Sequence, residues 1–193
     1  MKALTVRQQV NRINKYMAKA SAREIKQGLN WYSAAHELCV ELSERYHVSL
    51  VQVAQVISVL SPQKKWETNK IEVVALFNEV FNDVKPSFKY FATKQMLIEC
   101  KAIIRGEFSI PQKRTKTYSF ADNIADKESR EVTIDRHALR VAYDDKSAKL
   151  DKVSAKQYRE AREAYRVVAE QHGLKAYEVQ AITWVVYKRI VNR

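Results

Sequence analysis

Glycine and proline are scarce in this chain of 193 residues, which contains three of each. In average proteins, glycine makes up about 7% and proline about 5% of the residues. A dinucleotide-binding loop, a Walker phosphate-binding loop and the turn that carries the nucleophilic serine of many hydrolases all need closely spaced glycines. The sequence excludes these sites and disfavours all-β folds, which place glycine and proline at their turns. We therefore expect an all-α protein, a single compact multi-helix domain over residues 1–193.

Cysteine and long apolar segments are also sparse. The two cysteines, Cys39 and Cys100, are too few for a four-thiolate zinc or iron–sulfur site. Both occupy apolar positions in helical patterns, which predicts buried free thiols in a reducing cytoplasm. No segment approaches the roughly 18 uncharged apolar residues of a membrane span, and the basic, amphipathic N-terminus does not resemble a signal peptide. We expect a cytoplasmic protein that binds no membrane, metal or cofactor, and we assume a monomer.

Basic residues are abundant, with 34 Lys and Arg against 22 Asp and Glu, a formal net charge of +12. A surplus of this size creates a positive field that attracts polyanions, of which nucleic acid is the commonest. The alternative is that the lysines only keep a helical surface soluble. DNA is the partner that we expect.

Apolar residues recur at helical spacing almost throughout the chain. Residues 50–60 are nearly all apolar, which predicts the central helix, with Ser49 as its N-cap. Ser61 is a candidate N-cap for the next helix, with Pro62 in its first turn. Ser154 and Gln157 have the spacing of a capping box. The expected helices are 6–17, one that Asn30 caps, 50–60, one from 61–62 to about 81, 91–105, a short one with Phe120 and Ile124, one from about Asp135, 154–171 closed by Gly173, and about 177–191.

Three polar segments interrupt the apolar pattern, at residues 60–69, 113–124 and 132–140. Residues 59–70, with Leu-Ser-Pro-Gln after an apolar helix, resemble the corresponding element of endonuclease III-like DNA glycosylases, of the helix-hairpin-helix superfamily. Residues 132–140, Val-Thr-Ile-Asp-Arg-His-Ala-Leu-Arg, are similar to that family's Val-Asp-Thr-His-Val-x-Arg motif. Order and spacing agree over about residues 49–143, so the resemblance implies a DNA glycosylase-like fold and excision of a base from DNA.

The resemblance implies roles for individual residues. It aligns Asp135 with the family's catalytic aspartate, because His137 and Arg140 follow it. It aligns Lys116 with the lysine of those members that also cleave the strand, and the 19 residues between Lys116 and Asp135 are close to the family's spacing. Trp31 and its neighbours, and residues 180–184, are also similar to segments of small bacteriophage proteins.

The chain departs from the family at the hairpin. The family has Leu-Pro-Gly-x-Gly, whereas residues 110–116 contain no glycine. Those glycines let backbone N–H groups approach a DNA phosphate closely. Here Lys113 and Arg114 would have to hold the phosphate by their side chains. The family's C-terminal iron–sulfur cysteines are absent as well.

The chemistry of base removal explains why a carboxylate is needed. Departure of the base leaves positive charge on the deoxyribose, which a fixed carboxylate at Asp135 stabilises while it orients a nucleophile. If that nucleophile is the neutral amine of Lys116, a Schiff base and strand cleavage follow; if it is water, the enzyme is a simple hydrolase. The alternatives are that Asp135 only caps a helix and that Lys116 is a solvated surface lysine. Asp122 is a weaker carboxylate candidate.

Other residues are candidates for DNA contact. Residues of the 60–69 segment could enter a groove, fill the space of a flipped base or line its pocket; alternatively, Trp66 is a core residue and the lysines are surface residues. His137 has no partner at metal-ligand spacing and is expected in the core or behind the site. Gln180 and Trp184, one turn apart, either close the pocket or simply pack. The candidate DNA contacts are Gln63, Lys64, Lys65, Trp66, Asn69, Lys113, Arg114, His137, Arg140, Gln180 and Trp184.

Three functions compete. The leading hypothesis is a phage-encoded, DNA glycosylase-like enzyme that acts on a flipped base, either with or without an additional lyase activity. The second is a DNA-binding protein without catalysis on the same scaffold. The third is a base-modifying transferase that acts on hypermodified phage DNA and needs a small-molecule donor.

Overall fold

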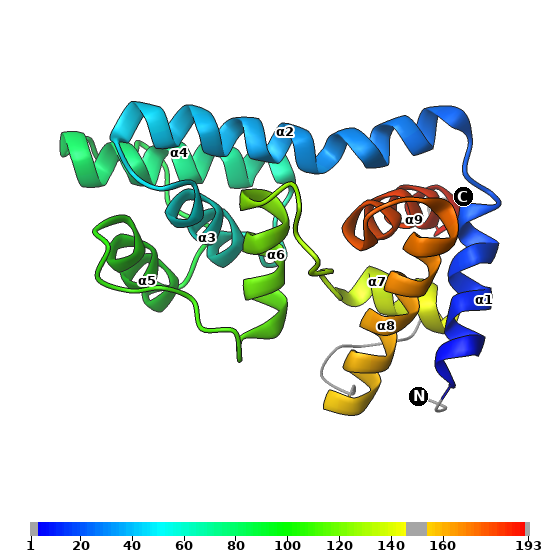
Figure 1. The fold of residues 1–193 in the computed structure, drawn as a ribbon. Coiled ribbons are helices and arrows are strands. Elements are labelled where there is room, and N and C mark those ends of the chain that lie inside the picture. The colour runs from blue at the N-terminus through cyan, green and yellow to red at the C-terminus, as the bar shows by residue number, and fades with distance from the viewer. Residues whose placement is uncertain (1–3, 146–153, 192–193) are drawn as a thin grey trace. The chain divides into compact units, whose positions relative to one another are not determined.

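The structure, a computed structural model, describes residues 4–145 and 154–191 (Figure 1). The regular structure of these residues is entirely helical, which confirms the all-α prediction. None of the described helices is long and apolar enough to cross a bilayer. The helices are α1 (Val6–Met17), α2 (Ala22–Tyr46), α3 (Leu50–Leu60), α4 (Trp66–Asn82), α5 (Lys94–Ile104), α6 (Thr115–Ala125), α7 (Arg136–Tyr143), α8 (Ala155–His172) and α9 (Ala176–Val191).

The chain divides into two compact units. The terminal unit consists of Met1–Ala34 and Glu128–Arg193, and the inserted unit is the continuous segment Ala35–Lys127. Helix α2 contributes to both, because the boundary at Ala34 falls inside it. The single domain over residues 1–193 stays a prediction, since contacts within each unit do not decide whether either folds alone.

In the terminal unit, α1, α7, α8 and α9 pack around one apolar core. The apolar spacing of each helix places its buried residues on one face, among them Ile13, Leu139, Tyr165 and Ile182. Helix α2 approaches α9 at Gly28: a Cβ atom added there would lie 2.6 Å from the Cα atom of Ile182. Only glycine allows this approach, which explains why it stands in the middle of a helix.

In the inserted unit, α3 is the central helix, as predicted. All its residues from Val53 to Leu60 are buried, and it packs against α4, α5 and α6. Its polar side chains fix these neighbours: the Gln52 amide donates to the Ile103 carbonyl (2.9 Å), and the Ser58 hydroxyl donates to the Thr117 carbonyl (2.7 Å). The positions of α5 and α6 on α3 are therefore set by specific hydrogen bonds as well as by apolar packing.

Several predicted helix ends are confirmed. Ser49 and Ser154 cap α3 and α8 through capping boxes with Gln52 and Gln157. Gly173 closes α8 in the left-handed conformation, with φ of 64°. Both cysteines are buried free thiols, as expected, and burial raises the pKa of Cys39 to about 12 and that of Cys100 as well.

Two predicted helix starts are wrong. Asn30 does not begin a helix but lies within α2, which begins at Ala22. The capping box there joins Ser21 and Glu24: the Glu24 N–H donates to Ser21 Oγ (3.3 Å), and the Ser21 N–H donates to Glu24 Oε2 (2.9 Å). Ser61 does not cap α4 either. It ends α3 with helical backbone angles, and its hydroxyl donates to the Ser58 carbonyl (2.9 Å).

Candidate functional site

Asp135 is held at the start of α7. The preceding Val132 and Ile134 are fully buried, which anchors the extended backbone that leads into the helix. The Ala138 N–H donates to Asp135 Oδ1 (2.7 Å), so the aspartate is the N-cap of α7, as predicted. Its side chain is 24% exposed. The carboxylate is therefore both fixed in orientation and accessible to a ligand.

His137 lies between this carboxylate and α9. Its Nδ1 atom is 3.3 Å from Asp135 Oδ2, and its ring makes edge-to-face contacts with Trp184 and Tyr187, with centroid distances of 6.5 and 5.8 Å. The residues that the structure describes contain no group of three His, Cys, Asp or Glu side chains that could hold a metal ion. The site thus offers His137 as a hydrogen-bonding and aromatic group.

The charge of Asp135 acts on three tyrosines, of which Tyr32 and Tyr165 are buried and Tyr158 is half-buried. Burial is the main cause that raises the pKa of Tyr32, Tyr158 and Tyr165, and the negative charge of Asp135 raises each further. The pKa of Tyr158 reaches about 12. These hydroxyls therefore stay protonated at neutral pH. Tyr165 donates to the Ala138 carbonyl (3.2 Å), which fixes the same turn of α7 that Asp135 caps.

A stripe on α9 continues the site. It consists of Gln180, Trp184 and Lys188, which stand four residues apart and so share one helix face. Gln180 is buried and accepts a hydrogen bond from the Tyr32 hydroxyl (3.3 Å), Trp184 is half-buried, and Lys188 is exposed with its Nζ atom 4.3 Å from the centroid of the Trp184 ring. We call these three residues the α9 stripe.

Sequence reasoning missed several residues near Asp135. Lys188 could have been found from helical spacing, because it follows Trp184 by one turn. Arg136 is the exposed first residue of α7. It was not predicted, because its neighbours Asp135 and His137 carry the stronger motif signals. Tyr32 carries no local signal for its place beside Gln180, since its contact with α9 is tertiary. Arg140, which was predicted, lies one turn after Arg136 and is half-buried.

In the inserted unit, the turn before α4 presents some of its predicted residues to solvent. Gln63 is exposed and has left-handed backbone angles, with φ of 58°. Lys65 is exposed at the N-cap position of α4, where its side chain makes no capping hydrogen bond. Trp66 is half-buried, with Lys70 Nζ 6.0 Å from its ring centroid. Gln63 and Lys65 remain available for contact with a ligand.

Lys64 and Asn69 face the interior instead. Lys64 forms an ion pair with Glu72 in which the side chains are 1% and 3% exposed, and Glu72 Oε1 also accepts the Phe91 N–H (2.6 Å). Asn69 is buried, and its Nδ2 donates to the Ile57 carbonyl (3.2 Å). Lys64 was expected either at DNA or on the surface, and it occupies neither position. Its ammonium instead holds the turn against α4.

The segment of residues 110–116 has one engaged cation and two exposed ones. Arg114 forms an ion pair with Glu99, whereas Lys113 and Lys116 are exposed. Lys116 lies in the first turn of α6, and Asp122 lies half-buried further along that helix. A covalent role for Lys116 would require a bound substrate to desolvate its amine.

The structure brings together Asp135, His137 and Trp184, and Gln180 lies one turn before Trp184 on α9. These residues belong to the terminal unit. Arg140 belongs to the terminal unit as well, whereas the predicted residues from Gln63 to Lys116 belong to the inserted unit.

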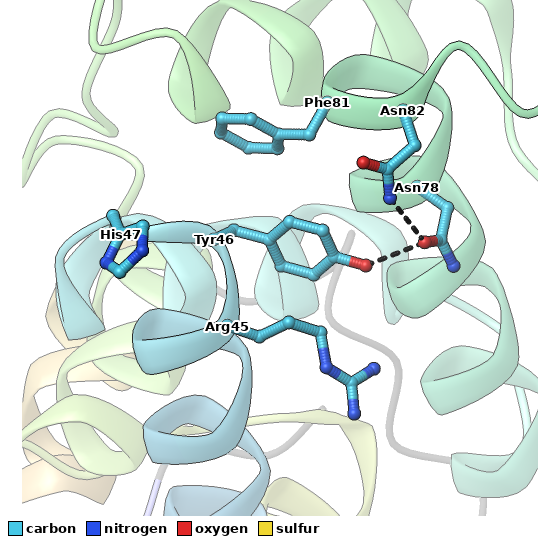
Figure 2. A pocket seen from close by; sticks show the side chains of 6 residues that line it. All are labelled: Arg45, Tyr46, His47, Asn78, Phe81 and Asn82. Atoms are coloured by element: carbon cyan, nitrogen blue, oxygen red, sulfur yellow. Dashed lines mark hydrogen bonds between the residues drawn. The ribbon is translucent and has the colours of Figure 1, made fainter.

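A hollow in the inserted unit, of about 430 Å³, contains none of the predicted residues (Figure 2). It lies where α2 and α4 end. Asn78 Oδ1 accepts hydrogen bonds from the Tyr46 hydroxyl (2.8 Å) and from Asn82 Nδ2 (3.1 Å). This network joins the two helices. The lining residues are Arg45, Tyr46, His47, Asn78, Phe81 and Asn82.

Comparison with known proteins gives a family but no activity. No curated protein and no solved structure matches the sequence. One family model, described as a family of unknown function (DUF7178), matches residues 1–191. The match spans almost the whole chain, and the protein therefore belongs to this family.

Proposed function

We propose that the protein is a DNA glycosylase-like enzyme that acts on a nucleotide turned out of the duplex, with Asp135 as its catalytic carboxylate. The observation that carries the proposal is the geometry of Asp135. Its Oδ1 atom is fixed by the Ala138 N–H, its Oδ2 atom faces His137, and its side chain is 24% exposed. The cap accounts for the fixed orientation, and the partial exposure leaves the carboxylate accessible to a substrate.

The geometry suits the chemistry of base removal. The bond between C1′ of the deoxyribose and the base breaks, and the base leaves with the electron pair, so positive charge develops on the sugar. A carboxylate that is already oriented stabilises this charge without reorganisation. Water then forms the new bond to C1′ and gives a proton to Asp135. The half-buried ring of Trp184 provides a stacking surface for the extruded base.

A lyase route would use the Lys116 amine in place of water and would produce a Schiff base. Borohydride trapping on oligonucleotides that carry modified or mispaired bases separates the two routes. An adduct that is absent in Lys116→Ala supports the lyase route, whereas base release without an adduct supports hydrolysis by water.

The variant Asp135→Asn tests the proposal itself. Asparagine keeps a side-chain oxygen for the cap, so the fold should be retained. We expect single-turnover base release to fall by about 100-fold or more, while DNA binding is retained. Glu163→Gln, an exposed acid-to-amide change on α8, is the matched control. Unchanged base release in Asp135→Asn would remove this residue from the mechanism.

A DNA-binding protein without catalysis is the second candidate. It is favoured by the hairpin segment, which lacks glycine and whose Arg114 is engaged with Glu99. This candidate predicts salt-sensitive, sequence-tolerant binding and no product from any substrate. Base release by the unaltered protein from even one modified oligonucleotide rules it out.

A further inference from the structure

The positive charge of the chain is distributed unevenly between the two units. The terminal unit has 21 Lys and Arg against 11 Asp and Glu, whereas the inserted unit has 13 against 11. Within the described residues of the terminal unit the balance is 16 against 10. Attraction of a polyanion follows the net field, so most of the chain's attraction for DNA originates in the terminal unit.

Ion pairs engage cations in both units, and in the inserted unit they engage two of the predicted DNA contacts. Lys64, a candidate DNA contact, is engaged with Glu72, and Arg114, expected at a DNA phosphate, is engaged with Glu99. The hairpin segment has no glycine that would let its backbone N–H groups approach a phosphate closely. The inserted unit still has exposed lysines, such as Lys65 and Lys113, but its basic and acidic residues nearly balance.

Two exposed cations of the terminal unit lie beside the candidate site. Arg136 directly follows Asp135, and Lys188 covers the Trp184 ring that His137 contacts. Neither forms an ion pair with another of the described residues. A carboxylate that receives a polyanion needs such cations, because they offset its repulsion of the phosphates.

We propose that the terminal unit makes the principal phosphate contacts with DNA, and that Arg136 and Lys188 are the contacts nearest to Asp135. The proposal rests on the proposed function for the identity of the polyanion. It assigns to the terminal unit the phosphate-binding role that sequence analysis gives to Lys113 and Arg114. It also gives Lys188 two functions, since the ammonium that covers Trp184 would bind the phosphate of a nucleotide whose base meets that ring.

Three matched double variants test this assignment, each of which removes two exposed cations. Arg136→Gln with Lys188→Gln changes the terminal unit, and Lys65→Gln with Lys113→Gln changes the predicted contacts of the inserted unit. Lys85→Gln with Lys94→Gln, exposed in the inserted unit and assigned no contact, controls for net charge. Affinity for an undamaged duplex is measured over a series of salt concentrations, and thermal unfolding confirms that each variant is folded.

Each phosphate contact contributes about 0.9 to the slope of log affinity against log salt concentration. We expect the terminal pair to lower this slope by about 1.8, and both pairs of the inserted unit to lower it by less. An equal or larger effect of Lys65→Gln with Lys113→Gln would overturn the proposal. So would an unaltered protein that shows no salt-dependent DNA binding.

The two proposals fail in different ways. If Asp135→Asn keeps its activity, or if no substrate yields a product, the enzymatic function fails while the salt slopes still support the terminal unit as the phosphate-binding unit. If base release depends on Asp135 but the terminal pair leaves the slope unchanged, the function stands and the phosphate assignment fails.

Discussion

The buried ion pair between Lys64 and Glu72 distinguishes a structural lysine from a DNA-binding one. Both side chains are almost fully buried, and Glu72 also holds the Phe91 N–H (2.6 Å). One carboxylate thus fastens both the turn before α4 and the connection before α5. Replacing Lys64 with Met removes the cation and leaves this carboxylate in the interior.

The expected magnitude follows from burial. Breaking a buried ion pair by removal of one partner costs about 3–5 kcal/mol, whereas replacing both partners with apolar residues is often neutral. In Lys64→Met with Glu72→Leu, the Phe91 N–H loses its acceptor, which costs about 1–3 kcal/mol. The double variant should therefore be more stable than Lys64→Met alone. A solvated lysine would change stability by less than about 0.5 kcal/mol.

Urea unfolding followed by far-UV circular dichroism measures these free energies, with Lys65→Met as the exposed neighbouring control. The double variant should bind DNA with the affinity of the unaltered protein, because the Lys64 charge is already neutralised within the fold. A loss below about 1 kcal/mol for Lys64→Met, or a double variant that is folded but has lost most of its DNA affinity, would refute this reasoning.

Three further variants test the packing, a buried carboxylate and a helix cap. Gly28→Ala would gain about 1 kcal/mol from helix propensity alone, but its Cβ would lie 2.6 Å from the Ile182 Cα atom, so we expect a net loss of about 1–3 kcal/mol; a raised Tm would contradict this. The hydrogen bond from Arg189 is the main cause that lowers the pKa of Glu24 from 4.5 to about 2. Because this pKa is lower in the folded state, its contribution to stability is complete above about pH 4.5 and is lost as the pH falls toward 2. Glu24→Gln should therefore show a smaller fall in Tm between pH 5 and 2 than the unaltered protein, and an equal fall would show that other groups govern the acid sensitivity. Ser154→Ala removes a capping hydroxyl and should cost about 1 kcal/mol in urea unfolding; no loss would mean that the cap has no energetic weight.

Helix ends were predictable where the signal is local. Ser49, Ser154 and Gly173 act within a few residues of their own helices, and the structure places them as expected. The start of α2 was missed although Ser21 and Glu24 also form a local capping box. The polar side chain of Asn30 was a misleading signal. Nothing local shows that α2 runs past Gly28, because the reason for this glycine is its approach to Ile182 on α9.

The site was predictable to the extent that it depends on one helix start. Asp135 is an N-cap because of its own sequence context, and His137 follows within the same turn. Lys64 and Asn69 are different, since their surroundings are tertiary. Glu72 lies eight residues after Lys64, a separation from which no regular spacing predicts an ion pair. Sequence alone gives the number of cations, whereas the fold decides which of them an acid neutralises.

The cap and the catalytic role of Asp135 can be separated, because they make different demands on the side chain. Capping needs one oxygen that accepts the Ala138 N–H (2.7 Å). Stabilisation of positive charge on a sugar needs the negative charge itself. A carboxylate oxygen can accept more than one hydrogen bond, so the cap and the His137 contact leave it able to act on a substrate. Asp135→Ser and Asp135→Asn both keep a capping oxygen and both lose the charge. If capping were the whole role, both variants would fold and would release bases as the unaltered protein does. If the charge is essential, both variants fold but neither releases the base.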